Sequence, residues 1–403
     1  MIWLRGIVGI AGIVGIAWLL SNNRRRFPLR TVAWGLALQL VLALLIFRVP
    51  GGQTALQKLS ELVLRFTSFS AEGAKMVFGN LADQHGGAWG YVFAFNALPM
   101  IIYFSAVMSI LYYLGVMQVV IWAIARAMTG LMRTSGAETL TVASNIFVGQ
   151  TEAPLVAKPY VPTMTRSEIM AMMTGGFGTI AGSVMVVYMQ FVGEEYARHL
   201  ISASFMAAPA ALVLAKVMFP ETEESATGGR VPLRFDRQGA NFLEAIAMGV
   251  TDGLHLALNV GAMLIAFVAL VKLLNWPLGA LGTSLDAVLG WLFHPFAWLM
   301  GVDGPDRGTV GGLLGMKIAT NEFLAFLQLK DLKEQLSPRS VTIATFMLCG
   351  FANFASIGIQ IGGIGAIAPT RKTDLARIAF RAMIAGALTS CLTATFAGMF
   401  ARV

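Results

Sequence analysis

Two glutamates draw attention because each lies in an apolar stretch and has a side-chain amide beside it. Glu152 follows Gln150 and Thr151, and Glu322 follows Asn321. A carboxylate at membrane depth is costly unless it meets a polar partner, so such a residue usually faces a protein cavity and carries function. The two acids therefore predict a polar binding site inside an apolar protein.

A purely structural explanation is an ion pair, which would join Glu152 to Lys158 or Glu322 to Lys317. Paired lysines would neutralise the two charges, but they would not explain the amides beside them. The two acids also recur at matching places in a repeat described below, which favours a shared function over two unrelated ion pairs.

Further residues suit a small polyhydroxyl ligand that carries an aromatic ring. Asn353 and Ser356 are three residues apart and so share one face of a helix. With Glu322 they offer donors and acceptors to neighbouring hydroxyl groups, as a ribose presents them. Phe351 is placed to cover a planar base, although ordinary helix packing is its simpler role.

A second group of residues suits a hard cation. Asn145, the carbonyl of Val148, and Thr179 with the carbonyl of Ile180 are neutral oxygen donors near two places where a helix is expected to break. Carbonyl groups freed at such breaks are the usual ligands of sodium in transporters with interrupted helices.

These residues belong to an internal repeat. Its first copy contains G-Q-T-E at 149–152, T-R-S at 165–167, G-G-F at 175–177 and T-I-A-G-S at 179–183, and its second contains T-N-E-F at 320–323, P-R-S at 338–340, C-G-F at 349–351 and A-S-I-G at 355–358. In both copies an acid is followed by a basic turn and then by a helix interrupted at glycine. Two similar halves with interrupted helices indicate a transporter whose site lies near the middle of the membrane.

The spacing predicts that each acid lies at the tip of a re-entrant hairpin. The stretch from Thr139 to Gln150 is long enough for roughly 16 Å of helix, about half of a bilayer. The return limb contains a cluster of prolines and ends near Thr163, so the first hairpin covers about 139–163 and the second about 309–334. Irregular backbone at that depth is tolerated only where protein or a water-filled cavity surrounds it.

The composition agrees with a membrane protein, since 57% of the 403 residues are hydrophobic and only 12% are charged. Globular soluble domains average about a quarter charged residues. Apolar runs that could cross the bilayer lie at 2–20, 29–49, 92–116, 168–192, 199–219, 258–276 and 374–400. No soluble stretch is long enough for a nucleic-acid-binding domain, so no nucleic acid is expected as a partner.

The chain divides into four parts: N-terminal transmembrane helices with an interfacial segment at 1–90, a first half at 91–219, a linker with an interfacial helix at 220–257, and a second half at 258–403 with a scaffold helix, the second hairpin, a broken helix and a final helix. Three arginines at 24–26 follow the first apolar run. By the positive-inside rule they place residues 22–30 in the cytoplasm and the N-terminus outside.

Two other groups carry less weight. Asp252 and His255 share a helix face, but no third ligand for a metal lies near them, and a polar face of an interfacial helix explains them better. Cys349 and Cys391 lie in apolar segments without C-x-x-C spacing, which indicates small buried side chains.

Four motifs together resemble the concentrative nucleoside transporters. They are G-Q-T-E-A-P at 149–154, N-E-F-L-A-F at 321–326, G-F-A-N-F-A-S-I-G-I-Q-I-G-G at 350–363, and the stretch from Ser202 to Glu223. The likeness runs from about residue 90 to the C-terminus, and the first and third motifs are highly specific.

The resemblance implies an all-α polytopic membrane protein with about eight transmembrane helices, two re-entrant hairpins and discontinuous helices in an inverted repeat, assembled as a homotrimer in the bacterial inner membrane and surrounded by lipid. Carried over by motif, the base contacts are Gln150, Thr151 and Glu152, the ribose contacts are Glu322, Asn353 and Ser356, the base is lined by Phe351 and Val184, and the sodium site is Asn145, Val148, Thr179 and Ile180. Thr179 stands where some relatives carry Ser, which keeps the oxygen but leaves the sodium affinity open.

The expected activity is import of nucleosides of the uridine and adenosine type by symport with sodium, with no cofactor besides this coupling ion. A proton-coupled symporter, with Glu152 or Glu322 as the proton carrier, is the alternative within the same class. An intramembrane enzyme would need a nucleophile or metal beside Glu322, and none is found. A passive channel is the remaining alternative.

Overall fold

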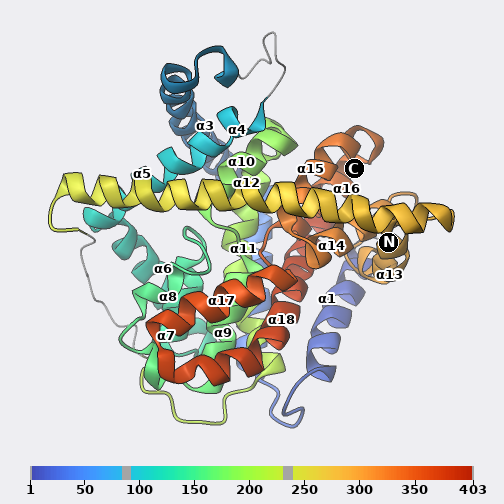
Figure 1. Cartoon of the computed structure of the whole chain (residues 1–403). Helices are drawn as coiled ribbons and strands as arrows, with labels where there is room; N and C mark the ends of the chain where they lie inside the picture. The colour runs from blue at the N-terminus through green and yellow to red at the C-terminus, as the bar shows by residue number, and fades with distance from the viewer. Residues whose placement is uncertain (1, 84–91, 230–238, 402–403) are drawn as a thin grey trace.

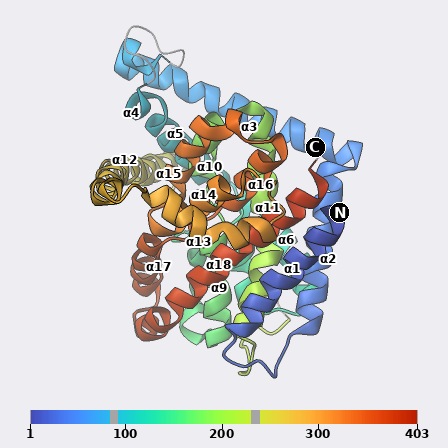
Figure 2. The same cartoon turned by 90° about the vertical axis from the view of Figure 1, so that its right-hand side faces the viewer.

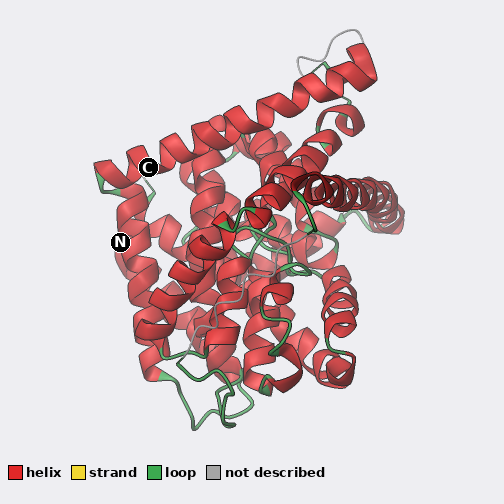
Figure 3. Ribbon diagram, turned by 90° about the vertical axis from the view of Figure 1, so that its left-hand side faces the viewer, coloured by secondary structure: helices red, strands yellow, loops and turns green. Residues whose placement is uncertain are grey.

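The computed structural model describes residues 2–83, 92–229 and 239–401, and within these ranges every regular element is a helix (Figure 3). The longer helices are α1 (Ile2–Leu19), α2 (Leu29–Phe47), α3 (Pro50–Phe78), α5 (Leu98–Tyr113), α6 (Val116–Met132), α11 (Glu194–Met218), α12 (Phe242–Ala280), α13 (Leu285–Leu299) and α18 (Lys372–Phe400). The shorter ones are α4 (Phe93–Asn96), α7 (Gly136–Ser144), α8 (Ala153–Val156), α9 (Arg166–Gly178), α10 (Gly182–Val192), α14 (Arg307–Ala319), α15 (Glu322–Leu332), α16 (Pro338–Leu348) and α17 (Phe354–Ile367), with 3-10 turns at Gly79–Ala82, Val161–Thr163, Lys333–Gln335 and Pro369–Arg371.

The expected membrane crossings are present in the structure. Among the described residues, seven helical stretches are long and apolar enough to span a bilayer: Ile2–Leu19, Leu29–Phe47, Phe93–Tyr113, Arg166–Val192, Glu195–Met218, Phe242–Ala280 and Pro369–Phe400. They overlap the seven runs expected from the sequence. The interrupted pair α16 and α17 provides the remaining crossing, since α17 is apolar but too short to span alone. The chain is therefore an all-α, multi-pass membrane protein.

One predicted boundary differs from the structure. An interfacial helix that ends at 257 and a separate scaffold helix from 258 were expected, but α12 runs without interruption from Phe242 to Ala280. Asp252 and His255 thus lie within a helix of membrane-spanning length, and both side chains are exposed. The apolar character of the stretch continues through their helical turn, so two polar residues do not end the helix.

The segment expected to be interfacial, 50–90, begins with the 29-residue helix α3. It carries charged side chains along an exposed face and is not among the candidate spans. Its 3-10 extension ends at Ala82, and the last residues of the predicted segment lie outside the described ranges.

The helices α3 and α12 lie at the edge of the molecule, and a group of buried helices forms its centre. α12 crosses in front of the other helices in Figure 1 and appears end-on at the side of the bundle in Figure 2, where α3 crosses the top. Only 6% of the apolar window of α12 is buried, against 94% for those of Arg166–Val192, Glu195–Met218 and Pro369–Phe400. The core therefore includes α9, α10, α11 and α18, whereas α12 leaves most of its surface uncovered by the rest of the chain.

Small residues attach α12 to the bundle. Ala245, Gly249, Gly253 and Ala257 recur every four residues and form the buried stripe of this helix. A Cβ at Gly253 would lie 2.7 Å from the Cα of Ile102 in α5, so glycine permits the close approach of the two backbones.

The same order of elements occurs twice in the chain. The first half contains the hairpin α7–α8, the broken helix α9–α10 and the long helix α11, and the second contains the hairpin α14–α15, the broken helix α16–α17 and the long helix α18. The long helices α11 and α18 pack against each other at the centre. The sequence repeat therefore corresponds to a structural one.

Both broken helices are interrupted at the places that the motifs predicted. α9 ends at Gly178 and α10 begins at Gly182, while α16 ends at Leu348 and α17 begins at Phe354. In the second break Gly350 has φ +143°, a conformation that L side chains rarely adopt. Its backbone also lies against Gly178, because a Cβ at Gly350 would be 2.8 Å from the carbonyl oxygen of Phe177. The two breaks therefore lie side by side.

Candidate functional site

The tips of both hairpins and the second segments of both broken helices surround one cavity. Its empty space is about 850 Å³, a value that includes the part open to the surroundings. All eight residues predicted to bind the nucleoside line it: Gln150, Thr151, Glu152, Val184, Glu322, Phe351, Asn353 and Ser356. The two acids, 170 positions apart in the sequence, thus share one cavity.

Glu322 is held in place by two hydrogen bonds from other helices. The hydroxyl of Tyr188 in α10 donates to Oε1 at 2.8 Å, and the side-chain amide of Asn353 donates to Oε2 at 3.1 Å. Tyr188 is fully buried and stacks on Phe326, with ring centroids 4.3 Å apart. A carboxylate has about four lone-pair sites, so Glu322 keeps about two for a ligand.

Local folding explains how the asparagines next to this acid are oriented. Asn353 is the N-cap of α17, and its Oδ1 accepts a hydrogen bond from the backbone N–H of Ser356 at 2.8 Å. Asn321 caps α15 in the same way through the N–H of Leu324. Such caps satisfy N–H groups that the first turn of a helix leaves unpaired. In Asn353 the cap uses the carbonyl and turns the amide group toward Glu322.

Gln150 connects the first hairpin to the second broken helix. Its amide nitrogen donates to Oγ of Ser356 at 3.2 Å, and its Oε1 accepts from Gln360 at 3.0 Å. Gln360 also donates to the carbonyl of Met173 at 3.2 Å. Gln150 is therefore partly engaged by the protein and keeps one N–H for a ligand.

Glu152 differs from Glu322 because its side chain is exposed to the cavities. It lies between this cavity and a second one, which is lined by α5, α12 and the first hairpin and includes Tyr112 and Asp252. Lys158 lines this second cavity too, but no ion pair joins it to Glu152 in the described part of the chain. The structural ion pair considered for Glu152 is not present.

The ion pair considered for Glu322 is not present either. The ammonium of Lys317 donates to the carbonyl of Met347 at 2.8 Å and to Oγ of Ser390 at 2.9 Å. Lys317 therefore binds the end of α16, while Glu322 faces the cavity with Tyr188 and Asn353.

The four residues predicted to bind sodium meet at a single junction. Asn145 and Val148 belong to the turn after α7, and Thr179 and Ile180 form the break between α9 and α10. The N–H of Gly182 donates to the carbonyl of Phe147 at 3.1 Å and joins the two segments.

The oxygens at this junction are available to a ligand. The Oδ1 of Asn145 is buried without a hydrogen-bond partner, and in the described ranges the carbonyls of Val148 and Ile180 accept no backbone hydrogen bond. The hydroxyl of Thr179 donates to the carbonyl of Gly175 at 2.8 Å, so its lone pairs are free to face a cation. Neutral oxygens of this kind suit a hard monovalent cation.

No group of three or more His, Cys, Asp or Glu side chains that could hold a metal ion occurs among the described residues. The two cysteines, Cys349 and Cys391, are free and buried, as expected.

The motifs did not indicate two residues that line the cavity, Tyr188 and Asn259, or Gln360, which donates to Gln150. Tyr188 follows Val184 by four positions, and Gln360 follows Ser356 by four, so helical spacing alone could have pointed to both. Asn259 of α12 also lines the cavity, but it lies in a helix whose packing against the site no local pattern indicates.

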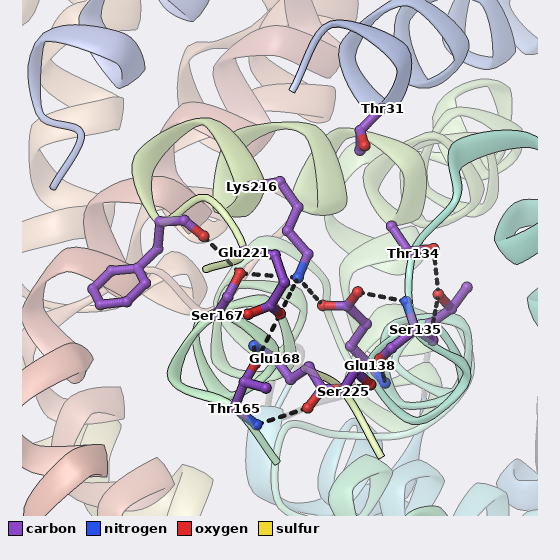
Figure 4. A network of polar contacts seen from close by, with 12 residues as sticks. Thr31, Thr134, Ser135, Glu138, Thr165, Ser167, Glu168, Lys216, Glu221 and Ser225 are labelled. Carbon is purple, nitrogen blue, oxygen red and sulfur yellow. Dashed lines mark hydrogen bonds and ion pairs between the residues drawn. The ribbon is translucent and has the colours of Figure 1, made fainter. Parts of the chain in front are cut away.

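The bases of the first hairpin and the first broken helix are joined by a buried polar network, shown in Figure 4. Ser135 and Glu138 form a capping box at the start of α7, and Thr165 and Glu168 form another at the start of α9. Lys216 of α11 lies 2.7 Å from Glu138, 3.3 Å from Glu221 and 2.9 Å from Oγ of Ser167. The segment after α11 closes over both helix starts, since Ser225 donates to Glu168 and the carbonyl of Thr227 accepts from Gly136.

Three family models match the chain. The model described as "Na+ dependent nucleoside transporter N-terminus" matches residues 8–81, the one described as "Nucleoside recognition" matches 94–195, and the one described as "Na+ dependent nucleoside transporter C-terminus" matches 199–398. The hairpin tips and breaks that form the cavity fall within the last two.

Similar proteins match along nearly the whole chain. An uncharacterised transporter of Haemophilus influenzae is 46% identical over 98% of this chain and 97% of its own length. The nucleoside permease NupC of Helicobacter pylori is 40% identical over 98% and 97%. The sodium/nucleoside cotransporter 2 of Rattus norvegicus is 41% identical over 98% of this chain, which spans 62% of that longer protein.

Solved structures of the transporter CNTnw are similar over the same extent. An inward-facing, substrate-bound state is 40% identical, covers 99% of this chain and 98% of its own, and has a TM-score of 0.93. A double variant in an outward-facing state is 39% identical, covers 99% and 98%, and has a TM-score of 0.94. The fold is thus shared with a protein that has been captured in alternating-access states.

These matches agree with a cavity that is lined by two carboxylates inside a multi-pass helical protein. The chain is a transporter rather than an enzyme, and it belongs to the Na⁺-dependent nucleoside transporter family.

Proposed function

We propose that this protein imports nucleosides across the bacterial inner membrane by symport with sodium. The observation that carries the proposal is the shared cavity, in which Glu152 and Glu322 from two hairpin tips face the same space. A carboxylate with free lone pairs beside an amide is suited to bind a pair of ribose hydroxyls.

The proposed contacts follow from the position of each side chain. Glu322, Asn353 and Ser356 form the ribose side, because Glu322 keeps free lone pairs there. Gln150, Thr151 and Glu152 form the base side at the opposite hairpin tip. Phe351 and Val184 line the space between them and supply an apolar surface for the ring.

Sodium is proposed to bind at the junction of Asn145, Val148, Thr179 and Ile180. Its support is the unpaired Oδ1 of Asn145 beside two free carbonyls. An ion there would tie the turn after α7 to the break of α9 and so order the first hairpin tip, which carries Gln150 and Glu152. Such a link between two sites typically amounts to about 1–3 kcal/mol of coupling.

The low burial of α12 supports the proposal of a homotrimer, in which partner chains would cover part of this helix. The N-terminus is proposed to lie outside and residues 22–30 inside, by the arginines that follow α1. A cysteine introduced at Asn23 should react with a membrane-impermeant maleimide only after the membrane is opened. Labelling of the cysteine in intact cells would contradict this topology and place residues 22–30 outside.

The test is uptake of labelled uridine by proteoliposomes. An inward sodium gradient should drive accumulation above the external concentration, adenosine should compete, and the accumulated compound should be unchanged. Uptake that persists with choline in place of sodium but collapses with a protonophore would instead establish a proton symporter. Equilibration without accumulation would establish a channel.

A further inference from the structure

Lys317 is the most deeply buried cation in the described part of the chain, and the proposed transport mechanism leaves it unused. It lies in the last turn of α14 and its side chain is completely buried. No carboxylate among the described residues forms an ion pair with it. An ammonium without a counter-ion is costly to bury unless other groups take the place of water.

The end of α16 supplies those groups. The last four carbonyls of a helix lack partners within it and carry a partial negative charge, which favours a cation. Lys317 donates to one of them, the carbonyl of Met347, at 2.8 Å. It also donates to Oγ of Ser390 at 2.9 Å, and this hydroxyl donates in turn to the carbonyl of Cys349 at 2.8 Å.

The first half of the chain has a comparable arrangement without a lysine. Asn145 lies at the C-terminal end of α7, as Lys317 does in α14, and α7 packs on α9 as α14 packs on α16. A Cβ at Gly175, near the end of α9, would lie 3.3 Å from the amide nitrogen of Asn145. In both halves the end of the first hairpin helix therefore packs against the last turn of the first segment of the interrupted helix.

We propose that the ammonium of Lys317 is a built-in cation that takes, in the second repeat, the place which sodium takes in the first. The proposal rests on the sodium site assigned under the proposed function. The break between α16 and α17 then keeps one conformation at all times, so that Glu322 and Asn353 stay oriented without a bound ion. Only the first hairpin depends on sodium, and each chain binds one sodium ion.

Chemical rescue tests the proposal. Lys317→Ala removes the ammonium and leaves a space, whereas Lys317→Met fills the space without a charge. Both variants should lower the melting temperature of the purified protein and reduce uridine uptake at least tenfold. Methylammonium present throughout purification and reconstitution should raise the melting temperature of Lys317→Ala and increase its uridine uptake at least fivefold, and it should change neither quantity for Lys317→Met. Lys330→Ala, which removes an exposed lysine of the same hairpin, should not respond to methylammonium.

Sodium itself provides a second measurement. In Lys317→Ala the vacated carbonyl and hydroxyl are open to sodium, so the melting temperature should rise in a second, weaker step as sodium replaces choline. This step should be absent from Lys317→Met and from the unmodified protein, whose uptake should depend on sodium with a Hill coefficient near one.

The proposal is overturned if Lys317→Met retains the melting temperature and uptake of the unmodified protein, or if neither methylammonium nor sodium acts on Lys317→Ala. A Hill coefficient near two in the unmodified protein would also overturn it, even if both variants failed to fold. If sodium coupling itself is wrong, the sodium curve of the unmodified protein is flat, but methylammonium still rescues the melting temperature of Lys317→Ala.

Discussion

Replacing Glu322 with glutamine isolates the contribution of its charge, because the hydrogen bonds to its neighbours can be kept by the glutamine side chain. In the structure the carboxylate accepts from Tyr188 and Asn353. A glutamine can turn its carbonyl to Asn353 and its amide to the hydroxyl of Tyr188, which accepts as well as donates. We therefore expect Glu322→Gln to fold and to melt close to the unmodified protein.

Binding of the nucleoside should nevertheless be lost. The two lone-pair sites that Glu322 keeps for the ligand each offer a charge-assisted hydrogen bond, which contributes about 1.5–3 kcal/mol. Two ribose hydroxyls would then lose about 3–6 kcal/mol, and because tenfold in affinity corresponds to about 1.4 kcal/mol, binding should weaken roughly a hundredfold to ten-thousandfold.

The assay is sodium-driven uridine uptake in proteoliposomes, together with uridine binding to the purified protein by calorimetry. Glu334→Gln is the matched control, since Glu334 is exposed at the far end of the same hairpin and should transport normally. Uptake by Glu322→Gln within threefold of the unmodified protein, at equal melting temperature, would refute the ribose assignment.

Three other substitutions test the surrounding structure. Tyr188→Phe removes one donor to Glu322 and should weaken uridine binding about tenfold while leaving the sodium dependence intact; an unchanged calorimetric affinity would show that the hydroxyl does not orient the acid. Asn145→Ala should shift the sodium activation curve of uptake to higher concentration more than it changes the preference between uridine and adenosine, and a superimposable sodium curve would remove Asn145 from the site. Lys216→Met leaves Glu138 without its buried partner, a loss of about 3–5 kcal/mol for such pairs, and should lower the melting temperature; equal melting curves would mean that the network of Figure 4 adds no stability.

Much of the architecture could be predicted, because a charged or polar side chain inside a membrane is costly and therefore usually marks a functional position. Glu152, Glu322 and the glycines at the two breaks stood out against an apolar background, and the repeat showed that they belonged together. The structure brings the two acids to one cavity and interrupts both helices where the motifs indicated.

What the sequence did not reveal depends on contacts between distant helices or on the continuity of a helix. The full length of α12 was missed because Asp252 and His255 suggested a polar boundary, although exposed polar side chains do not interrupt a helix. That Tyr188 would reach Glu322, and that Gln360 would hold Gln150, depends on how α10, α15 and α17 pack with the tip of the first hairpin. Asn353 was expected among the ribose contacts, but that its carbonyl would cap α17 was not foreseen.

The most direct measurement is a cryo-electron microscopy structure of the purified protein with saturating uridine and sodium. We expect density for one nucleoside between the hairpin tips, with its ribose in hydrogen-bond contact with Glu322 and Asn353 and its base toward Gln150 and Glu152. A nucleoside bound anywhere else, or one in contact with only one of the two hairpins, would contradict the shared site.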